Sequence, residues 1–201
     1  MKILKIELAA LFAFIICIIL STYNLDRRCD GVREGILRLH VIAASDSAND
    51  QQIKLLLRDE MLEKGKEIFS QSTSKKEAES KIGLGINELQ RRAEDFLESI
   101  DCPDTVSVSL EKSFFPTRKY ENFTLPAGYY DALRVVIGKG EGKNWWCVMF
   151  PALCLPAAKN KNPDFDGILT EAEQKIITDE RYEVRLWLVE KWQEVKSFYN
   201  N

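Results

Sequence analysis

An uninterrupted apolar run near the N-terminus constrains this chain more than any other feature of its sequence. Every residue from 8 to 20 is apolar, Lys2 and Lys5 precede the run, and the charged residues 26–28 follow it. A run of this length matches the hydrophobic part of a signal peptide and is short for a membrane span of about 20 residues. We therefore predict that residues 1–23 are an export segment, either a signal peptide or a signal anchor.

The fate of this segment is left open by the sequence. No small-x-small cleavage motif follows Leu20, and Cys29 lacks the small preceding residue of a lipoprotein signal. Cleavage and retention as an anchor are both open, and the other reading is a buried helix of the folded domain. Residues 24–35 are polar and contain Gly31 and Gly35, so we predict a linker there.

The rest of the chain has the size and composition of one domain, which we place at residues 36–199. Apolar residues make up 45% of the 201 residues, enough for a sizeable core. The 28 basic and 31 acidic residues form no concentrated basic surface, so we predict no nucleic-acid partner. We also predict no cofactor and no metal, because a zinc site needs close cysteine or histidine pairs and His40 is the only histidine.

Hydrophobic periodicity predicts an α+β fold. Residues 36–43 have the apolar, β-branched composition of a buried strand, and the segments 106–111, 130–137 and 145–150 also fit strands. Three helix starts are predicted at residues that can act as N-caps and have an acidic residue three positions later: Ser47, Ser74 and Thr170. This order predicts a mostly antiparallel sheet packed against two to three helices, behind the N-terminal hydrophobic targeting helix.

Two segments of this domain need a choice between readings. Gly138, Gly140 and Gly142 resemble a phosphate-cradling loop, but such a loop opens a helix and here a strand follows. We therefore predict the tip of a β-hairpin that joins 130–137 to 145–150. Residues 182–190 fit both a strand and a helix and are left open, with a helix from about Lys191 onward.

Export would place the cysteines in a compartment where disulfides persist. Besides Cys17 the chain has four cysteines: Cys29, Cys102, Cys147 and Cys154. Four cysteines allow three pairings. We favour a bond between Cys147 and Cys154, because a chain reversal at Pro151 would bring them together.

Several blocks of sequence resemble one known family. The first is Leu-Arg-Leu-His-Val-Ile-Ala-Ala-Ser-Asp-Ser at 37–47, followed by Asp50-Gln51 and Lys54-Leu55. Four further blocks belong to the set: residues 126–138, residues 140–154 and the pairs Val184-Arg185 and Val189-Glu190. Together they resemble stage II sporulation protein R, and the run Asn144-Trp145-Trp146-Cys147 is the most specific part. Ala44 and Ala152 stand where this family usually has Asn and Pro.

The resemblance implies a function. Members of this family are exported from the forespore of an endospore-forming bacterium into the space between two membranes. There they activate a membrane-embedded aspartic protease, which then cleaves the sigma-E precursor. On this reading the chain is a signalling protein and not an enzyme. Its partners are the protease and, through the N-terminal segment, the membrane, and it is membrane-associated or secreted.

We place the partner-binding surface on two of the quoted blocks. The predicted contact residues are Ser45, Asp46, Ser47, Asp50, Asn144, Trp145 and Trp146. The simpler reading makes Asp46 and Ser47 helix-start residues and packs one tryptophan in the core, since adjacent strand residues point to opposite faces. Large aromatic side chains are nevertheless frequent anchors of binding sites.

Two other functions stay open. An exported hydrolase would use His40 as the base and Ser45 or Cys147 as the nucleophile, which requires the two groups to lie about 3 Å apart. A histidine between apolar neighbours in a strand is more simply structural. A membrane-anchored structural protein of the envelope would need only the N-terminal segment.

Overall fold

The computed structural model describes the chain except for residues 1, 70–71, 152–164, 166 and 200–201. Within the described residues the fold is α+β, as predicted. The helices are α1 (Lys2–Gly35), α2 (Ala48–Phe69), α3 (Lys75–Leu84), α4 (Ile86–Ser99), α5 (Glu171–Thr178), the 3-10 helix η2 (Glu180–Tyr182) and α6 (Glu183–Tyr199). The strands are β1 (Leu37–Ile42), β2 (Val106–Phe115), β3 (Arg118–Lys119), β4 (Thr124–Leu125), β5 (Gly128–Ile137) and β6 (Asn144–Phe150).

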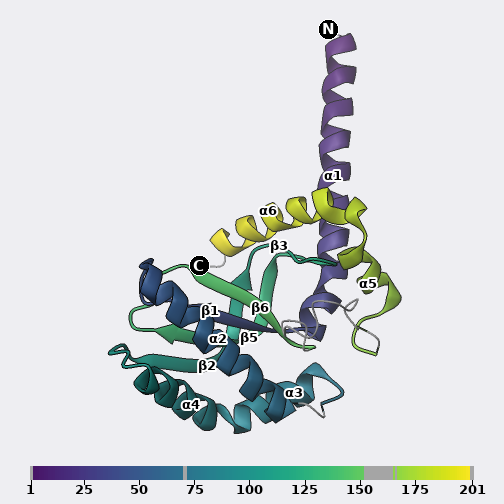
Figure 1. Cartoon of the computed structure of the whole chain (residues 1–201). Coiled ribbons are helices and arrows are strands. Elements are labelled where there is room, and N and C mark those ends of the chain that lie inside the picture. Colours follow the sequence, from purple (N-terminus) through teal and green to yellow (C-terminus); the bar gives the residue numbers. More distant parts are fainter. Residues whose placement is uncertain (1, 70–71, 152–164, 166, 200–201) are drawn as a thin grey trace.

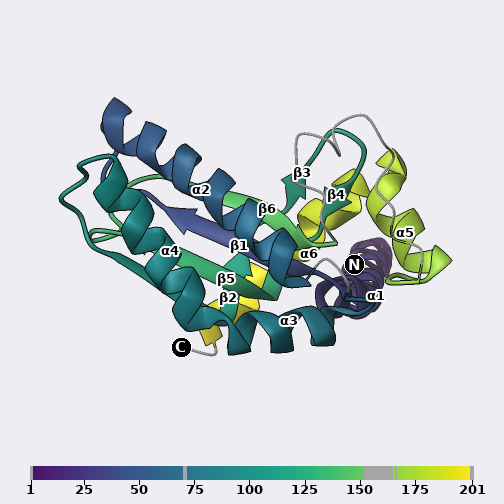
Figure 2. The ribbon, with the colours of Figure 1, turned by 60° about the horizontal axis from the view of Figure 1, so that its bottom comes forward.

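Four strands form one mixed sheet in the order β2-β5-β1-β6. The outer pairs β2–β5 and β1–β6 are antiparallel, so the sheet is mostly antiparallel, as predicted, and the central pair β1–β5 is parallel. Helices α2, α3 and α4 lie on one side of the sheet, and α1, α5 and α6 lie on the other (Figures 1 and 2). The short strands β3 and β4 pair only with each other.

The predicted β-hairpin between β5 and β6 is wrong. Strand β1 lies between these two strands and pairs with both of them. The glycine-rich loop therefore crosses the end of β1: the backbone N–H of Gly142 donates to the carbonyl oxygen of Ala43 at 2.9 Å, and that of Glu141 donates to Ala44 at 3.3 Å. Strand β1 is buried along almost its whole length, although one face carries Arg38 and His40, and this burial fits a central position with a neighbour at each edge.

The predicted linker at 24–35 is also wrong, because these residues form the last turns of α1. Leu25, Cys29 and Val32 are buried, and their spacing of four and three places them on one face of the helix. Polar residues between them conceal this spacing in the sequence. The apolar N-terminal segment therefore continues without a break into a helix that packs on the domain.

Each side of the sheet carries its own hydrophobic core. Leu39, Val41 and Leu133 pack under α2, α3 and α4. On the other side, Phe115, Tyr130 and the partly buried Trp146 belong to a second cluster. A third, smaller cluster joins α1, α5 and α6. Burial at about 25 cal/mol per Å² of apolar area makes these clusters the main source of stability.

The predicted helix starts are confirmed. The Ser47 hydroxyl accepts a hydrogen bond from the backbone N–H of Asp50 at 3.1 Å, and Ser74 caps α3 in the same way through Glu77. Thr170 and Glu173 form a complete capping box. Residues 182–190, which the sequence left open, are helical, because helix spacing buries Leu186, Val189 and Gln193 on one face.

Candidate partner-binding site

Two loops meet where β1 ends, and we call the region they form, residues 43–50 and 138–146, the β1 loop site. The backbone N–H of Lys143 donates to Asp46 Oδ1 at 2.7 Å, and Lys143 Nζ lies 3.8 Å from Asp46 Oδ2. Together with the hydrogen bond from Gly142 to Ala43, these contacts hold the crossing loop against the start of α2. All seven predicted contact residues therefore lie in one region of the surface.

The serine-rich segment is held by its own hydrogen bonds. Ser45 Oγ donates to Asp50 Oδ2 at 2.5 Å and accepts from the backbone N–H of Ser47 at 3.1 Å. Ser47 and Asp50 make the N-cap of α2. These side chains fix the loop shape, and Asp46 and Ser47 remain exposed at its surface.

Sequence reasoning missed two residues of α2 whose side chains hydrogen-bond to the backbone of this region. Gln51 Nε2 donates to the carbonyl oxygen of Ser45 at 2.9 Å, and Lys54 Nζ donates to the carbonyl oxygen of Lys143 at 3.0 Å. Burial lowers the pKa of Lys54, and the charge of Asp46 partly offsets the effect. A signal existed, because both residues lie in a block that resembles the sporulation family, but the block itself does not reveal their contacts.

The two tryptophans lie on opposite faces of the sheet, as the strand pattern predicts. Trp145 pairs with Val41 on the side of α2, where the guanidinium of Arg58 lies 4.4 Å from the centre of its ring. Trp146 lies on the other side, and the guanidinium of Arg118 is 3.9 Å from its ring centre. Trp145 is 36% exposed and Trp146 is half-buried. An arginine thus covers part of each indole ring, and any role in partner contact remains a prediction.

His40 belongs to the aromatic side of the sheet. Its ring stacks on Trp146 with centroids 5.9 Å apart and lies 5.7 Å from the ring of Phe115. His40 Nε2 is 2.8 Å from Asn144 Oδ1. Burial lowers the pKa of His40, although the bond to Asn144 partly offsets this effect. The imidazole is therefore neutral near pH 7, and its Nε2–H donates to Asn144.

The structure does not assemble the pairs that a hydrolase would use. His40 pairs with Trp146 across the strands, whereas Cys147 pairs with Leu39 and lies in the core under α2. Neighbouring strand residues point to opposite faces, so the sheet separates His40 from Cys147. The hydroxyl of Ser45 donates a hydrogen bond to the carboxylate of Asp50 and not to His40. The described geometry therefore gives no support to either nucleophile.

A comparison with protein families matches residues 33–160 to the family described as stage II sporulation protein R. The chain belongs to this family. Among curated proteins, stage II sporulation protein R of Bacillus subtilis (strain 168) is 38% identical over 118 residues. The match covers 59% of this chain and 53% of the relative, so it spans about half the length of that protein. No solved structure matches.

The match to stage II sporulation protein R covers the whole β1 loop site and the sheet, and it ends before α5 and α6. The predicted disulfide falls at the edge of what the structure describes. Cys147 is buried, and Cys154 lies outside the described residues, so their bond stays a prediction. Cys17, Cys29 and Cys102 are free thiols.

Helix α1 begins outside the family match and has the features of a membrane segment. Within the described part of the chain, it is the one helix long and apolar enough to cross a membrane. The side chains from 5 to 21 are exposed, and the buried ones begin at Thr22. A signal sequence has the same features. The finding supports a signal or membrane segment and leaves cleavage as a prediction.

Proposed function

We propose that this protein is an exported signalling protein that activates a membrane-embedded aspartic protease during endospore formation. Activation would lead to cleavage of the sigma-E precursor in the neighbouring compartment. The observation that carries the proposal is membership in the stage II sporulation protein R family over the residues that form the sheet and the β1 loop site. The apolar, exposed N-terminal half of α1 is compatible with export from the forespore.

A signalling ligand of this kind acts by binding. It can shift the protease toward its active state only as far as it binds that state more tightly than the inactive one. The β1 loop site suits this task because hydrogen bonds hold Asp46 and Asn144, and the Arg58 guanidinium covers Trp145, so these side chains have a defined arrangement before binding. Such preorganisation reduces the entropy lost on association.

The test is co-expression in a host that does not form spores. The full chain, the candidate protease and the sigma-E precursor are produced together, and cleavage of the precursor is measured on a gel. We expect cleavage only when all three are present. Full cleavage without this chain, or none with it, would contradict the proposal.

Two variants separate the alternatives in the same assay. His40→Gln removes any imidazole base and keeps a side-chain N–H that can donate to Asn144, so a hydrolase would lose its activity whereas a ligand would keep signalling. A cleavable export signal in place of residues 1–21 keeps the buried part of α1 from Thr22 onward. A soluble ligand still signals in that form, whereas an anchored structural protein of the envelope does not.

A further inference from the structure

Helix α6 carries exposed apolar side chains on the face opposite its packing face. Leu186 and Val189 are buried in a cluster with Leu25 and Cys29 of α1. Four other apolar residues of α6 are exposed, to 74%, 54%, 51% and 81%: Val184, Trp187, Val195 and Phe198. At about 100° per residue these four lie within an arc of about 80°. A soluble helix usually keeps such an arc polar.

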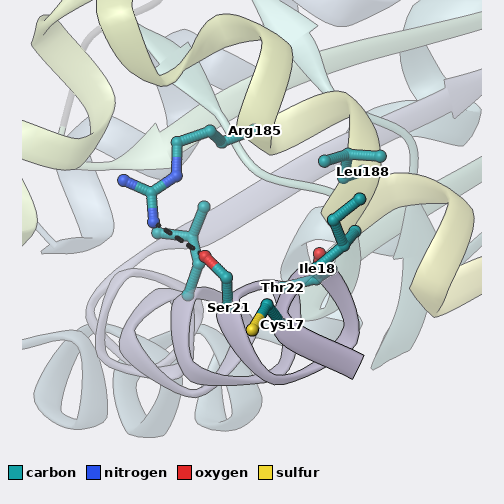
Figure 3. A pocket seen from close by; sticks show the side chains of 7 residues that line it. Cys17, Ile18, Ser21, Thr22, Arg185 and Leu188 are labelled. Carbon is teal, nitrogen blue, oxygen red and sulfur yellow. Dashed lines mark hydrogen bonds between the residues drawn. The ribbon is translucent and has the colours of Figure 1, made fainter. Parts of the chain in front are cut away.

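Helix α6 contacts α1 at the point along α1 where its exposed apolar side chains end. A groove of about 230 Å³ between the two helices is lined by Cys17, Ile18, Ser21, Thr22 and Leu25 of α1 and by Arg185 and Leu188 of α6 (Figure 3). Arg185 Nη2 donates to Ser21 Oγ at 3.5 Å. Helix α6 runs across α1 there, between the domain and the projecting N-terminal half of α1 (Figure 1).

The charged side chains of α6 are also divided between two sides of the helix. Leu188 and Arg185 face the N-terminal half of α1, so they mark the side of α6 that would face a membrane around that half. By the same helical spacing, the acidic residues lie on the opposite side of α6: Glu183, Glu190 and Glu194. The apolar arc begins beside Leu188 with Val195 and Val184, and it ends at Trp187, about 20° from Glu194. Lys191 within the arc can extend its amine to the headgroups.

The length of the apolar run gives an independent reason for close contact with lipid. Residues 8–20 extend about 20 Å as a helix, less than the hydrocarbon thickness of about 30 Å. A span shorter than the hydrocarbon core is accommodated by local thinning of the bilayer or by flanking residues that reach into the interface. Helix α6 is the part of the domain that lies at this level.

We propose that α6 lies in the headgroup region of the membrane that α1 enters, with Val184 and Val195 toward the lipid and Trp187 at the border between the apolar and the acidic sides. Tryptophan favours this interface, and a helix with one apolar face and one charged face binds along it. The proposal goes beyond the proposed function, which leaves open whether α1 is cleaved or retained. It assigns a second membrane contact to a helix outside the family match and implies that α1 is retained.

The test places the full-length chain in phosphatidylcholine vesicles and measures its tryptophan fluorescence. One set of vesicles carries bromine near the top of the acyl chains, where it quenches an indole at the interface. We expect the brominated lipid to lower the emission, and we expect Trp187→Phe to remove more of this loss than Trp192→Phe, because Trp192 is half-buried on the same helix. Trp145→Phe is the matched control, since Trp145 lies in the β1 loop site, and it should leave the loss unchanged.

The outcomes separate the inference from the proposed function. An inserted chain whose Trp187 escapes the brominated lipid and is quenched by aqueous acrylamide overturns the inference alone. Protection of Trp187 that depends on the protein-to-lipid ratio points to a second copy as the occupant and also overturns it. A chain extracted by alkaline carbonate overturns both the anchor and the inference, while precursor cleavage tests signalling separately.

Discussion

The two ends of this molecule present different surfaces. At the β1 loop site, polar side chains are bound to one another and to the backbone, and an arginine covers part of each tryptophan. At the other end, α1 and α6 expose apolar side chains, while charged groups are buried between them. The first surface is suited to water and a protein partner, and the second to lipid.

The contrast also concerns what holds each region. The β1 loop site depends on the close passage of one loop over another, with short hydrogen bonds between backbones. The junction of α1 and α6 depends on Asp26, which is buried and lies 2.8 Å from Arg33 and 2.7 Å from Lys196. A buried charge that loses a partner is far more costly than a surface pair.

The largest expected effect is therefore at the junction. Arg33 also donates from Nε and Nη2 to the carbonyl oxygen of Ala127, so Arg33→Met removes the partners of several buried groups at once. We expect the free energy of unfolding to fall by about 3–5 kcal/mol. Urea unfolding in detergent micelles measures it. Arg27→Met is the control, because Arg27 is exposed on the same helix, and an equal loss in both variants would contradict the account.

The loop crossing predicts a smaller loss in the other region. A Cβ at Gly142 would overlap the carbonyl of Ser45, which is backbone and cannot move aside easily. We expect Gly142→Val to cost about 1–3 kcal/mol and to speed amide exchange at Glu141, whose N–H bonds to Ala44 across the crossing. Hydrogen exchange and urea unfolding together measure the change.

A second glycine supplies a control of opposite sign. Gly83 lies inside α3 and has open space where its Cβ would be. Gly83→Ala should therefore raise the free energy of unfolding by about 0.5–1 kcal/mol. Destabilisation by both substitutions would show that the effect at position 142 is not specific to the crossing.

Local patterns were enough to predict much of the fold. The N-caps at Ser47, Ser74 and Thr170 and the strand at β1 depend on neighbouring residues, and the structure confirms them. The seven predicted contact residues also lie together, because the resemblance identified two blocks that the sheet brings to one edge. Their role in binding stays a prediction.

The errors concern which distant segments meet. Nothing local states that β1 inserts between β5 and β6, because strand pairing is decided by which strand can be buried on both edges. In the same way, the helical spacing of Leu25, Cys29 and Val32 has meaning only once other elements cover it. Helices α5 and α6 cover Leu25 and Cys29, and the second cluster beside the sheet covers Val32. The partners of Lys54 and Arg58 could not be predicted for the same reason.

The stability of the region beside the β1 loop site should depend on pH through His40. Because burial lowers the pKa of His40 below its value in the unfolded chain, protonation favours unfolding. Stability is then full above about pH 6.5 and falls as the pH drops through and below that value. His40 is the only histidine, so His40→Gln should flatten the change in urea midpoint between about pH 7.5 and 5.5. An unchanged slope would assign this dependence to carboxyl groups.

The smallest effect on stability is expected at Asp46, where the comparison between the two ends is most directly tested. Asp46→Asn keeps an oxygen that accepts from the backbone N–H of Lys143, and it removes the exposed charge pair with Lys143 and a weaker attraction to Lys54. Exposed pairs contribute about 0–1 kcal/mol, so the free energy of unfolding should barely change.

If the β1 loop site contacts the protease, precursor cleavage should nevertheless fall in the co-expression assay, because an interface charge steers association and selects the partner. The matched control is Glu194→Gln on α6, which also breaks an exposed pair. Equal precursor cleavage with the wild type and both variants would show that Asp46 does not contribute to protease contact. The contact would then have to lie elsewhere on the domain.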